Sequence, residues 1–137
     1  LSILWGWQEM STKTMHFKRG QTILEEGELS FEAYIILDGE VDVTKMFFNR
    51  NSPTKHVHLA TLREGEIFGE IGWLDRKPRT ATIKAKNRVS VKVLTEDDAV
   101  KITRDNPKAM MPILKVLGSR LRDTLELIEK FTGDPRL

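Results

Sequence analysis

The chain has 137 residues, of which 39% are apolar and 31% charged, and this composition is typical of one soluble globular domain. Its 22 basic and 20 acidic residues leave a net charge of +2, which is too small to favour nucleic acid or a membrane surface as a partner. The absence of cysteine excludes a disulfide framework and a thiolate metal site.

The first 13 residues form an apolar segment that we expect to be an N-terminal arm or a short helix. This segment lacks a basic n-region and is too short to span a membrane, so we expect a cytoplasmic protein without membrane contact. Trp5 and Trp7 are expected to pack on the domain that covers residues 14–137.

From Thr14 onward, short strands alternate with turn residues, as is typical of a sandwich or barrel. We expect strands at Met15–Phe17, Thr22–Glu25, Ala33–Leu37, Val41–Met46, His56–Leu62, Ile83–Ala85 and Val89–Val93. Asp38-Gly39 is predicted to close a hairpin, because this dipeptide suits a tight turn between strands. Asn49–Lys55 is predicted to be a polar loop, and Arg63–Glu66 a turn.

At Thr95 the spacing of apolar residues changes from about two to about 3.6, which predicts helices over residues 95–132. Thr95 and Asp98 have the spacing of a capping box, so a first helix is expected to run to about Arg104. Asn106-Pro107 is typical of an N-cap followed by the first helical position.

A long final helix is predicted to begin near Pro112 and to end near Thr132-Gly133. Its apolar residues follow the three–four spacing of a coiled-coil seam with one polar member: Leu114, Leu117, Leu121, Thr124, Ile128 and Phe131. This seam predicts a homodimer through the C-terminal helix.

The stretch 68–81, FGEIGWLDRKPRTA, is where a ligand site is expected. One turn of helix beginning near Glu70 would direct free backbone N–H groups at one point, and Gly69 would allow close approach of a ligand. Arg79 has the planar fork suited to a phosphate, and Glu70 can accept hydrogen bonds from two hydroxyls. An anion binder beside a hydroxyl binder suits a sugar phosphate.

This stretch resembles the phosphate-binding cassette of cyclic nucleotide-binding domains, which occur in catabolite activator proteins, cyclic-nucleotide-dependent kinases and gated channels. The resemblance covers roughly Phe17 to Ile128. It implies a mainly β fold, a double-stranded β-helix or jelly-roll β-roll over residues 14–94, followed by a short and a long helix. It also implies a non-enzymatic sensor without catalytic residues that binds cAMP first and cGMP as the alternative.

In the family that this chain resembles, the arginine that corresponds to Arg79 pairs with the cyclic phosphate, and the carboxylate that corresponds to Glu70 holds the ribose 2′-hydroxyl. Mainly backbone contacts to the ligand are implied for Gly69, Ile71, Thr80 and Ala81. The Thr80 hydroxyl suits either the phosphate or a guanine amino group, so it leaves the base open. Trp73 is expected to pack in the core beneath the cassette helix.

Residues 120–124 resemble the part of the activators' dimer helix where a threonine meets the adenine amino group. Arg120 and Thr124 are therefore candidate base contacts, although Thr124 also suits a polar position in the helix seam. Leu125 stands where the activators have a serine that reaches the other subunit's ligand, which argues against a cross-subunit polar contact there.

Two other classes of function compete with a sensor. His56-Val57-His58 has the His-x-His spacing of cupin metal enzymes, but the glutamate of that pattern is missing at Leu62 and Arg63, so no metal is expected. A DNA-binding regulator would need a helix-turn-helix after the long helix. Only six residues follow Phe131, so no DNA contact is expected from this chain.

Overall fold

The computed structural model describes residue 7, residues 13–49 and residues 52–132. The chain divides into two compact units, Leu1–Val100 and Lys101–Leu137. None of the helices described is both long enough and apolar enough to cross a membrane.

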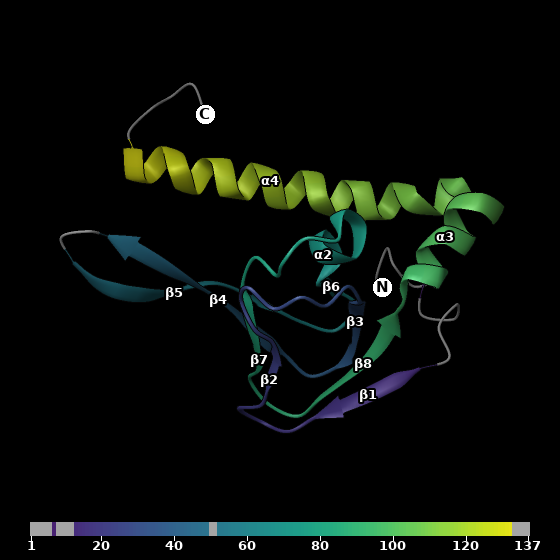
Figure 1. Cartoon of the computed structure of the whole chain (residues 1–137), viewed down its shortest axis with the longest axis horizontal. Coiled ribbons are helices and arrows are strands. Elements are labelled where there is room, and N and C mark those ends of the chain that lie inside the picture. The colour runs from purple at the N-terminus through teal and green to yellow at the C-terminus, as the bar shows by residue number, and fades with distance from the viewer. Residues whose placement is uncertain (1–6, 8–12, 50–51, 133–137) are drawn as a thin grey trace. The chain divides into compact units, whose positions relative to one another are not determined.

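Eight strands in the first unit form two four-stranded antiparallel sheets (Figure 1). One sheet has the order β1 (Thr14–Phe17), β8 (Val89–Leu94), β3 (Ala33–Asp38) and β6 (Ile67–Phe68). The other has the order β2 (Thr22–Leu24), β7 (Thr82–Ala85), β4 (Val41–Asn49) and β5 (Ser52–Leu62). Sequence neighbours are thus distributed over two sheets, and the predicted jelly roll is confirmed.

The core lies between the sheets and follows the alternation of the strands. Val89, Val91 and Val93 of β8 are buried, whereas the residues between them are partly exposed, because successive side chains point to opposite faces. β3 instead has four consecutive buried residues, 33–36, so both faces of this part of the strand are covered. Its Tyr34 ring stacks on Phe68 with the ring centroids 5.1 Å apart.

The predicted hairpin at Asp38-Gly39 is wrong. β3 pairs with β6 and β8, whereas β4 pairs with β5 and β7, so this turn carries the chain from one sheet to the other. Gly39 has a positive φ of 91°, and the turn is bonded to the β7–β8 connection, where the Glu40 N–H donates to Asn87 Oδ1 at 2.7 Å. The local turn chemistry was interpreted correctly, but it does not select the partner strand.

The predicted loop Asn49–Lys55 is largely wrong, because β4 continues to Asn49 and β5 begins at Ser52. Residues 50–51 of that prediction lie outside the described residues. β5 is the edge strand of its sheet, so the missing N–H of Pro53 does not interrupt the ladder between central strands. The resulting long β4–β5 hairpin extends beyond the remaining strands of the roll (Figure 1).

Three α-helices and a 3-10 segment complete the described chain: α2 (Glu70–Asp75), α3 (Glu96–Asp105), η1 (Pro107–Met110) and α4 (Met111–Thr132). The capping box is confirmed, since the Thr95 N–H donates to Asp98 Oδ2 at 2.8 Å and the Asp98 N–H donates to Thr95 Oγ1 at 3.3 Å. Asn106 occupies the N-cap of η1, but its side chain makes no cap hydrogen bond. The start near Pro112 and the end at Thr132 of the final helix are also confirmed.

Trp73 is a core residue of the first unit, as predicted. Its side chain is 2% exposed, and its indole Nε1–H donates to the Thr95 carbonyl at 2.8 Å. Trp7 is equally buried and meets the Trp73 ring edge to face, with centroids 5.6 Å apart. Packing of the N-terminal segment is therefore confirmed at Trp7, whereas Trp5 lies outside the described residues.

Candidate functional site

The cassette contains the buried charges of this fold. Among the side chains that the structure describes, the only charged or polar ones in the buried interior are Glu70 and Arg79, which are 5% and 4% exposed. Burying a charge is unfavourable unless partners compensate for the lost water. The two residues at the centre of the predicted site therefore occupy a position that packing alone does not explain.

Three acceptors hold the Arg79 guanidinium. Nε–H donates to Ser30 Oγ at 2.9 Å, Nη1–H to the Gly69 carbonyl at 2.9 Å, and Nη2–H to the Glu32 carbonyl at 2.7 Å. An arginine side chain has five N–H donors, so five minus these three leaves two, one on each terminal nitrogen. The guanidinium is thus oriented by the protein while part of its fork can meet a ligand.

Two glycines make room for this guanidinium. A Cβ on Gly69 would lie 3.0 Å from Arg79 Nη1 and 3.0 Å from the Glu32 carbonyl oxygen, and Gly69 has a φ of +75°. A Cβ on Gly72 would lie 3.1 Å from the same Nη1. Gly69 was expected to allow close approach of a ligand, and in the structure Gly69 and Gly72 both allow close approach of Arg79 itself.

The turn between β2 and β3 fixes the backbone of Arg79. The Gly27 N–H donates to the Arg79 carbonyl at 2.8 Å, and the Arg79 N–H donates to the Glu28 carbonyl at 2.9 Å. The same connection supplies Ser30 and Glu32 to the guanidinium. Sequence reasoning missed these supporting residues, because nothing in their local pattern indicates a partner in the cassette.

Charge and burial act in opposite directions at this centre. Burial lowers the pKa of the Arg79 guanidinium, and the neighbouring Tyr34, Glu28, Glu32 and Glu70 oppose that shift. An arginine starts from so high a pKa that it keeps its charge in proteins. Burial also raises the pKa of Tyr34 to about 12. The centre therefore combines a cation with nearby carboxylates, as recognition of an anion beside hydroxyls requires.

The remaining cassette residues of the prediction surround Arg79 in sequence and differ in exposure. Ile71 is 43% exposed, Thr80 is exposed and Ala81 is half-buried. The Thr80 carbonyl accepts a hydrogen bond of 2.9 Å from Lys45 Nζ, a residue that sequence reasoning did not consider. The structure thus joins Arg79 to Gly69, whereas Thr80 is bonded to Lys45.

Arg120 and Thr124 lie on α4, in the second unit. The Thr124 hydroxyl donates to the Arg120 carbonyl at 2.8 Å, so the structure joins these two candidates to each other. Their contact with a base remains a prediction.

The two histidines of the alternative metal site are exposed on β5. His58 Nε2 lies 3.0 Å from Asp42 Oδ1 and 3.1 Å from Thr61 Oγ1, in a polar cluster on the outside of the β4–β5 hairpin. Within the described ranges, no three His, Cys, Asp or Glu side chains come together in a group that could hold a metal ion. No described donor set supports a metal-dependent enzyme.

The Asp42 cluster predicts a pH dependence of stability. The Thr61 hydroxyl, which donates at 2.7 Å, and His58 lower the pKa of Asp42 from 3.8. Because the folded pKa is depressed, the stabilising contribution is present above the unfolded value and is lost as pH falls below about 4. The free energy of unfolding should therefore fall more steeply between about pH 5 and pH 3 in wild type than in Asp42→Asn. Denaturant titrations measure this pH dependence. The control variant Asp38→Asn, at an exposed strand end, should keep the wild-type pH dependence. If the free energy of unfolding fell equally steeply with pH in wild type and in Asp42→Asn, the assignment would be contradicted.

Fold and site together define a class of domain: a jelly roll that presents a buried arginine from a loop after a short helix. The family described as "Cyclic nucleotide-binding domain" matches residues 14–106. The CRP-like cAMP-activated global transcriptional regulator of Mycobacterium tuberculosis is 31% identical over 109 residues, which are 79% of this chain and 46% of that protein. The chain thus spans less than half of that relative's length and belongs to the cyclic nucleotide-binding domain family. The resemblance inferred from residues 68–81 is confirmed.

Solved structures agree with this assignment. The catabolite activator protein of Thermus thermophilus superposes with a TM-score of 0.82 at 22% identity, covering 95% of this chain and 59% of that one, and so shares the fold. The EAL enzyme Bd1971 in its cAMP-bound form is 28% identical with a TM-score of 0.62, covering 85% of this chain and 30% of that one. Bd1971 has also been solved in a cGMP-bound form.

Proposed function

We propose that this chain is a non-enzymatic, cytoplasmic sensor domain whose regulatory ligand is cAMP, with cGMP as the alternative. One observation carries the proposal: the buried Arg79 guanidinium is held by three protein acceptors and keeps two donors for an anion. The cAMP-activated relative from Mycobacterium tuberculosis supports cAMP as the first ligand to test. The two ligand-bound forms of Bd1971 support keeping both bases under test.

In this proposal the two remaining Arg79 donors bind the exocyclic oxygens of the cyclic phosphate. A bidentate contact to a planar guanidinium is charge-assisted and therefore among the stronger hydrogen-bonded pairs. The Glu70 carboxylate accepts the ribose 2′-hydroxyl, while backbone groups of Gly69, Ile71, Thr80 and Ala81 complete the contacts. Because α2 has only six residues, we assign the anion chiefly to Arg79 and not to a helix dipole.

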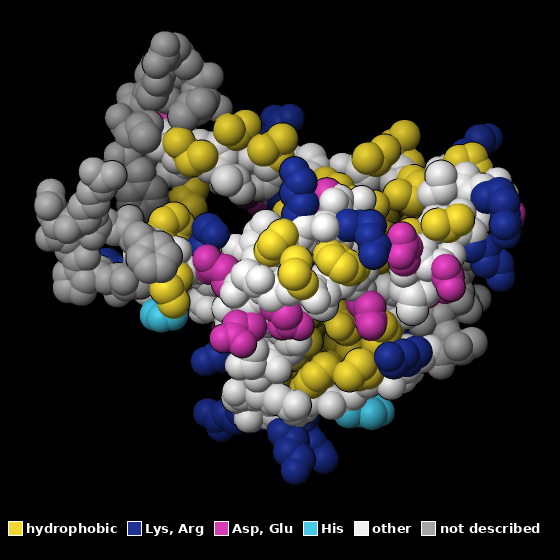
Figure 2. Space-filling model, in the orientation of Figure 1, with side chains coloured by type: hydrophobic (Ala, Val, Ile, Leu, Met, Phe, Trp, Pro, Cys, Tyr) yellow, Lys and Arg dark blue, Asp and Glu magenta, His cyan; other side chains and the backbone are white. Residues whose placement is uncertain are grey.

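The C-terminal helix is proposed to report ligand binding. In this proposal the base meets α4 near Arg120 and Thr124, so that the ligand biases the position of the helix; a coupling of about 1–3 kcal/mol would be typical. Leu114, Leu121 and Ile128 of the predicted seam are exposed in the single chain, which supports a homodimer through α4. Acidic and basic side chains are interspersed on the face shown in Figure 2, and we propose no DNA contact from this chain.

Calorimetry with four ligands tests the proposal on the wild-type chain. We expect cAMP and cGMP to bind with micromolar or tighter affinity, and 5′-AMP to bind far more weakly, because its phosphate is open and more highly charged. The analogue 2′-deoxy-cAMP should bind roughly tenfold to a hundredfold more weakly than cAMP, since it cannot donate to Glu70. Absence of binding by both cyclic nucleotides at millimolar concentration would overturn the function.

A further inference from the structure

Lys45 is a partly exposed charged residue of β4, one position beyond the last residue of β4 that pairs with β7. The pairing of β4 with β7 is regular, with Val41 opposite Ala85, Val43 opposite Ile83 and Thr44 opposite Thr82. Because side chains alternate along a strand, Lys45 points to the same side as Val41 and Val43, which belong to the core. The Lys45 side chain is 37% exposed, so its stem follows the core side of the strand while its ammonium group stays in reach of solvent and of a ligand.

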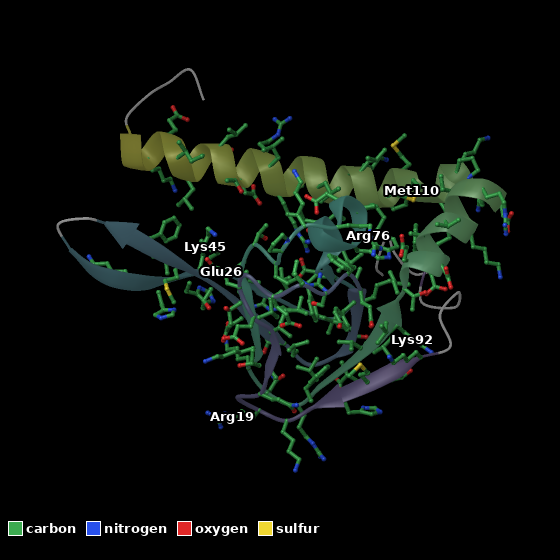
Figure 3. All side chains as sticks on the ribbon, in the orientation of Figure 1. Arg19, Glu26, Lys45, Arg76, Lys92 and Met110 are labelled. Carbon is green, nitrogen blue, oxygen red and sulfur yellow. The ribbon has the colours of Figure 1, made fainter. Side chains whose placement is uncertain are left out.

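The Lys45 ammonium is attached to the end of the cassette. Nζ donates to the Thr80 carbonyl at 2.9 Å and to Glu26 Oε2 at 3.4 Å. Glu26 is itself held, since its Oε1 accepts the Met46 N–H at 3.0 Å. Figure 3 shows Glu26 and Lys45 beside each other where β4 leaves the roll. A lysine has three donors, so three minus two leaves one for a ligand that lies against Thr80.

The electrostatic balance indicates which part of a nucleotide this donor meets. Glu26 already offsets the charge of Lys45, with 3.4 Å between the ion-paired atoms, whereas Arg79 keeps two donors for the single charge of a cyclic phosphate. A neutral acceptor on the base therefore suits Lys45 better than the phosphate does. Guanine presents the acceptors N7 and O6 along one edge, whereas adenine presents N7 and an amino donor.

We propose that Lys45 is a specificity-determining residue that donates to the O6 and N7 edge of a bound guanine and raises affinity for cGMP relative to cAMP. An ammonium group has no acceptor, so it meets the adenine amino group as donor against donor. This inference rests on the proposed function, because it requires that a cyclic nucleotide occupies the cassette. It assigns the preference for one base to the β-roll, in addition to any contribution from α4.

Calorimetry of cAMP, cGMP and inosine 3′,5′-cyclic monophosphate with wild type, Lys45→Met and Lys45→Arg tests the inference. The inosine nucleotide has O6 but lacks the guanine amino group, so it separates the Lys45 contact from any contact of Thr80 with that amino group. Lys45→Met should weaken cGMP and the inosine nucleotide about tenfold or more and cAMP less than about threefold. Lys45→Arg keeps a cationic donor and should stay closer to wild type. Lys92→Met, on a strand of the other sheet, is the matched control and should change no affinity.

Each other outcome overturns the inference. If Lys45→Met lowered the affinity for all three nucleotides equally, Lys45 would contact the phosphate. If the affinities did not change, Lys45 would not contact the ligand. If Lys45→Met changes the affinity for the inosine nucleotide as little as the affinity for cAMP, then the protein recognises the guanine amino group and not O6. If Lys45→Met is unfolded at the titration temperature, the variants Lys45→Arg and Lys45→Gln replace it. The ratio of cGMP affinity to cAMP affinity should then fall in Lys45→Gln and stay near the wild-type value in Lys45→Arg. Failure of wild type to bind any cyclic nucleotide would refute the proposed function itself.

Discussion

Replacing Arg79 with lysine is expected to weaken cAMP binding by roughly tenfold to a hundredfold or more. A lysine at this position can still donate to the carbonyls of Gly69 and Glu32, but it has no planar fork with two further donors for the phosphate. Calorimetric titration of cAMP into the variant measures the loss. Alanine is a poorer choice, because it would leave Ser30 and both carbonyls without their buried donor and would destabilise the fold as well.

The control for this experiment is Arg19→Lys, in the exposed turn between β1 and β2 (Figure 3). That variant should bind cAMP as wild type does, which excludes a general effect of lowering arginine content. The melting temperature of unliganded Arg79→Lys shows whether the domain remains folded. If a folded Arg79→Lys bound cAMP with wild-type affinity, the phosphate would have to be held elsewhere in the molecule.

Replacing Gly39 with alanine is expected to destabilise the domain by about 3 kcal/mol or more, because it forces a collision with backbone. The new Cβ would lie 2.0 Å from the Arg88 carbonyl oxygen and 2.9 Å from Asn87 Oδ1, at a φ of +91°. The carbonyl cannot rotate away as a flexible side chain could, so the turn between the two sheets must shift. Thermal unfolding should show a melting temperature lower by about 10 °C or more.

Gly20→Ala provides the matched comparison. Gly20 also has a positive φ, +83°, but a Cβ there would meet nothing within 4 Å. Its alanine variant should therefore lose only the left-handed backbone preference, about 1–2 kcal/mol. The difference between the two variants isolates the collision, and equal destabilisation would mean that the Gly39 turn relaxes without resistance.

Local physical chemistry explains why much of this protein could be predicted. The alternation of Val89, Val91 and Val93 specifies a strand with one buried face, and the reciprocal bonds of Thr95 and Asp98 start a helix within four residues. The cassette residues 68–81 are contiguous, so their order alone predicted a short helix that begins at Glu70 and is followed by Arg79. Each of these features depends on neighbours in the chain, and a sequence displays such neighbours directly.

Pairing between distant segments was decided by the tertiary structure. Asp38-Gly39 has the chemistry of a tight turn, but only the competition among strands gave β3 the partners β6 and β8 and made the turn a passage between sheets. Pro53 was compatible with a strand because β5 lies at an edge, which no local pattern reveals. Strand order is set by how the whole chain buries its apolar faces, so turn residues alone do not determine it.

The chemical detail of the site was also decided in three dimensions. The sequence by itself determined that an arginine and a carboxylate would occupy one cassette, and the structure buries both. Two of the three acceptors that orient the Arg79 guanidinium are distant in the chain: Ser30 is 49 residues away and Glu32 is 47 residues away. Lys45 likewise lies 35 residues from Thr80, whose carbonyl it contacts. Such contacts exist only once the two sheets have closed on each other, because a hydrogen bond depends on position in space and not on separation along the chain.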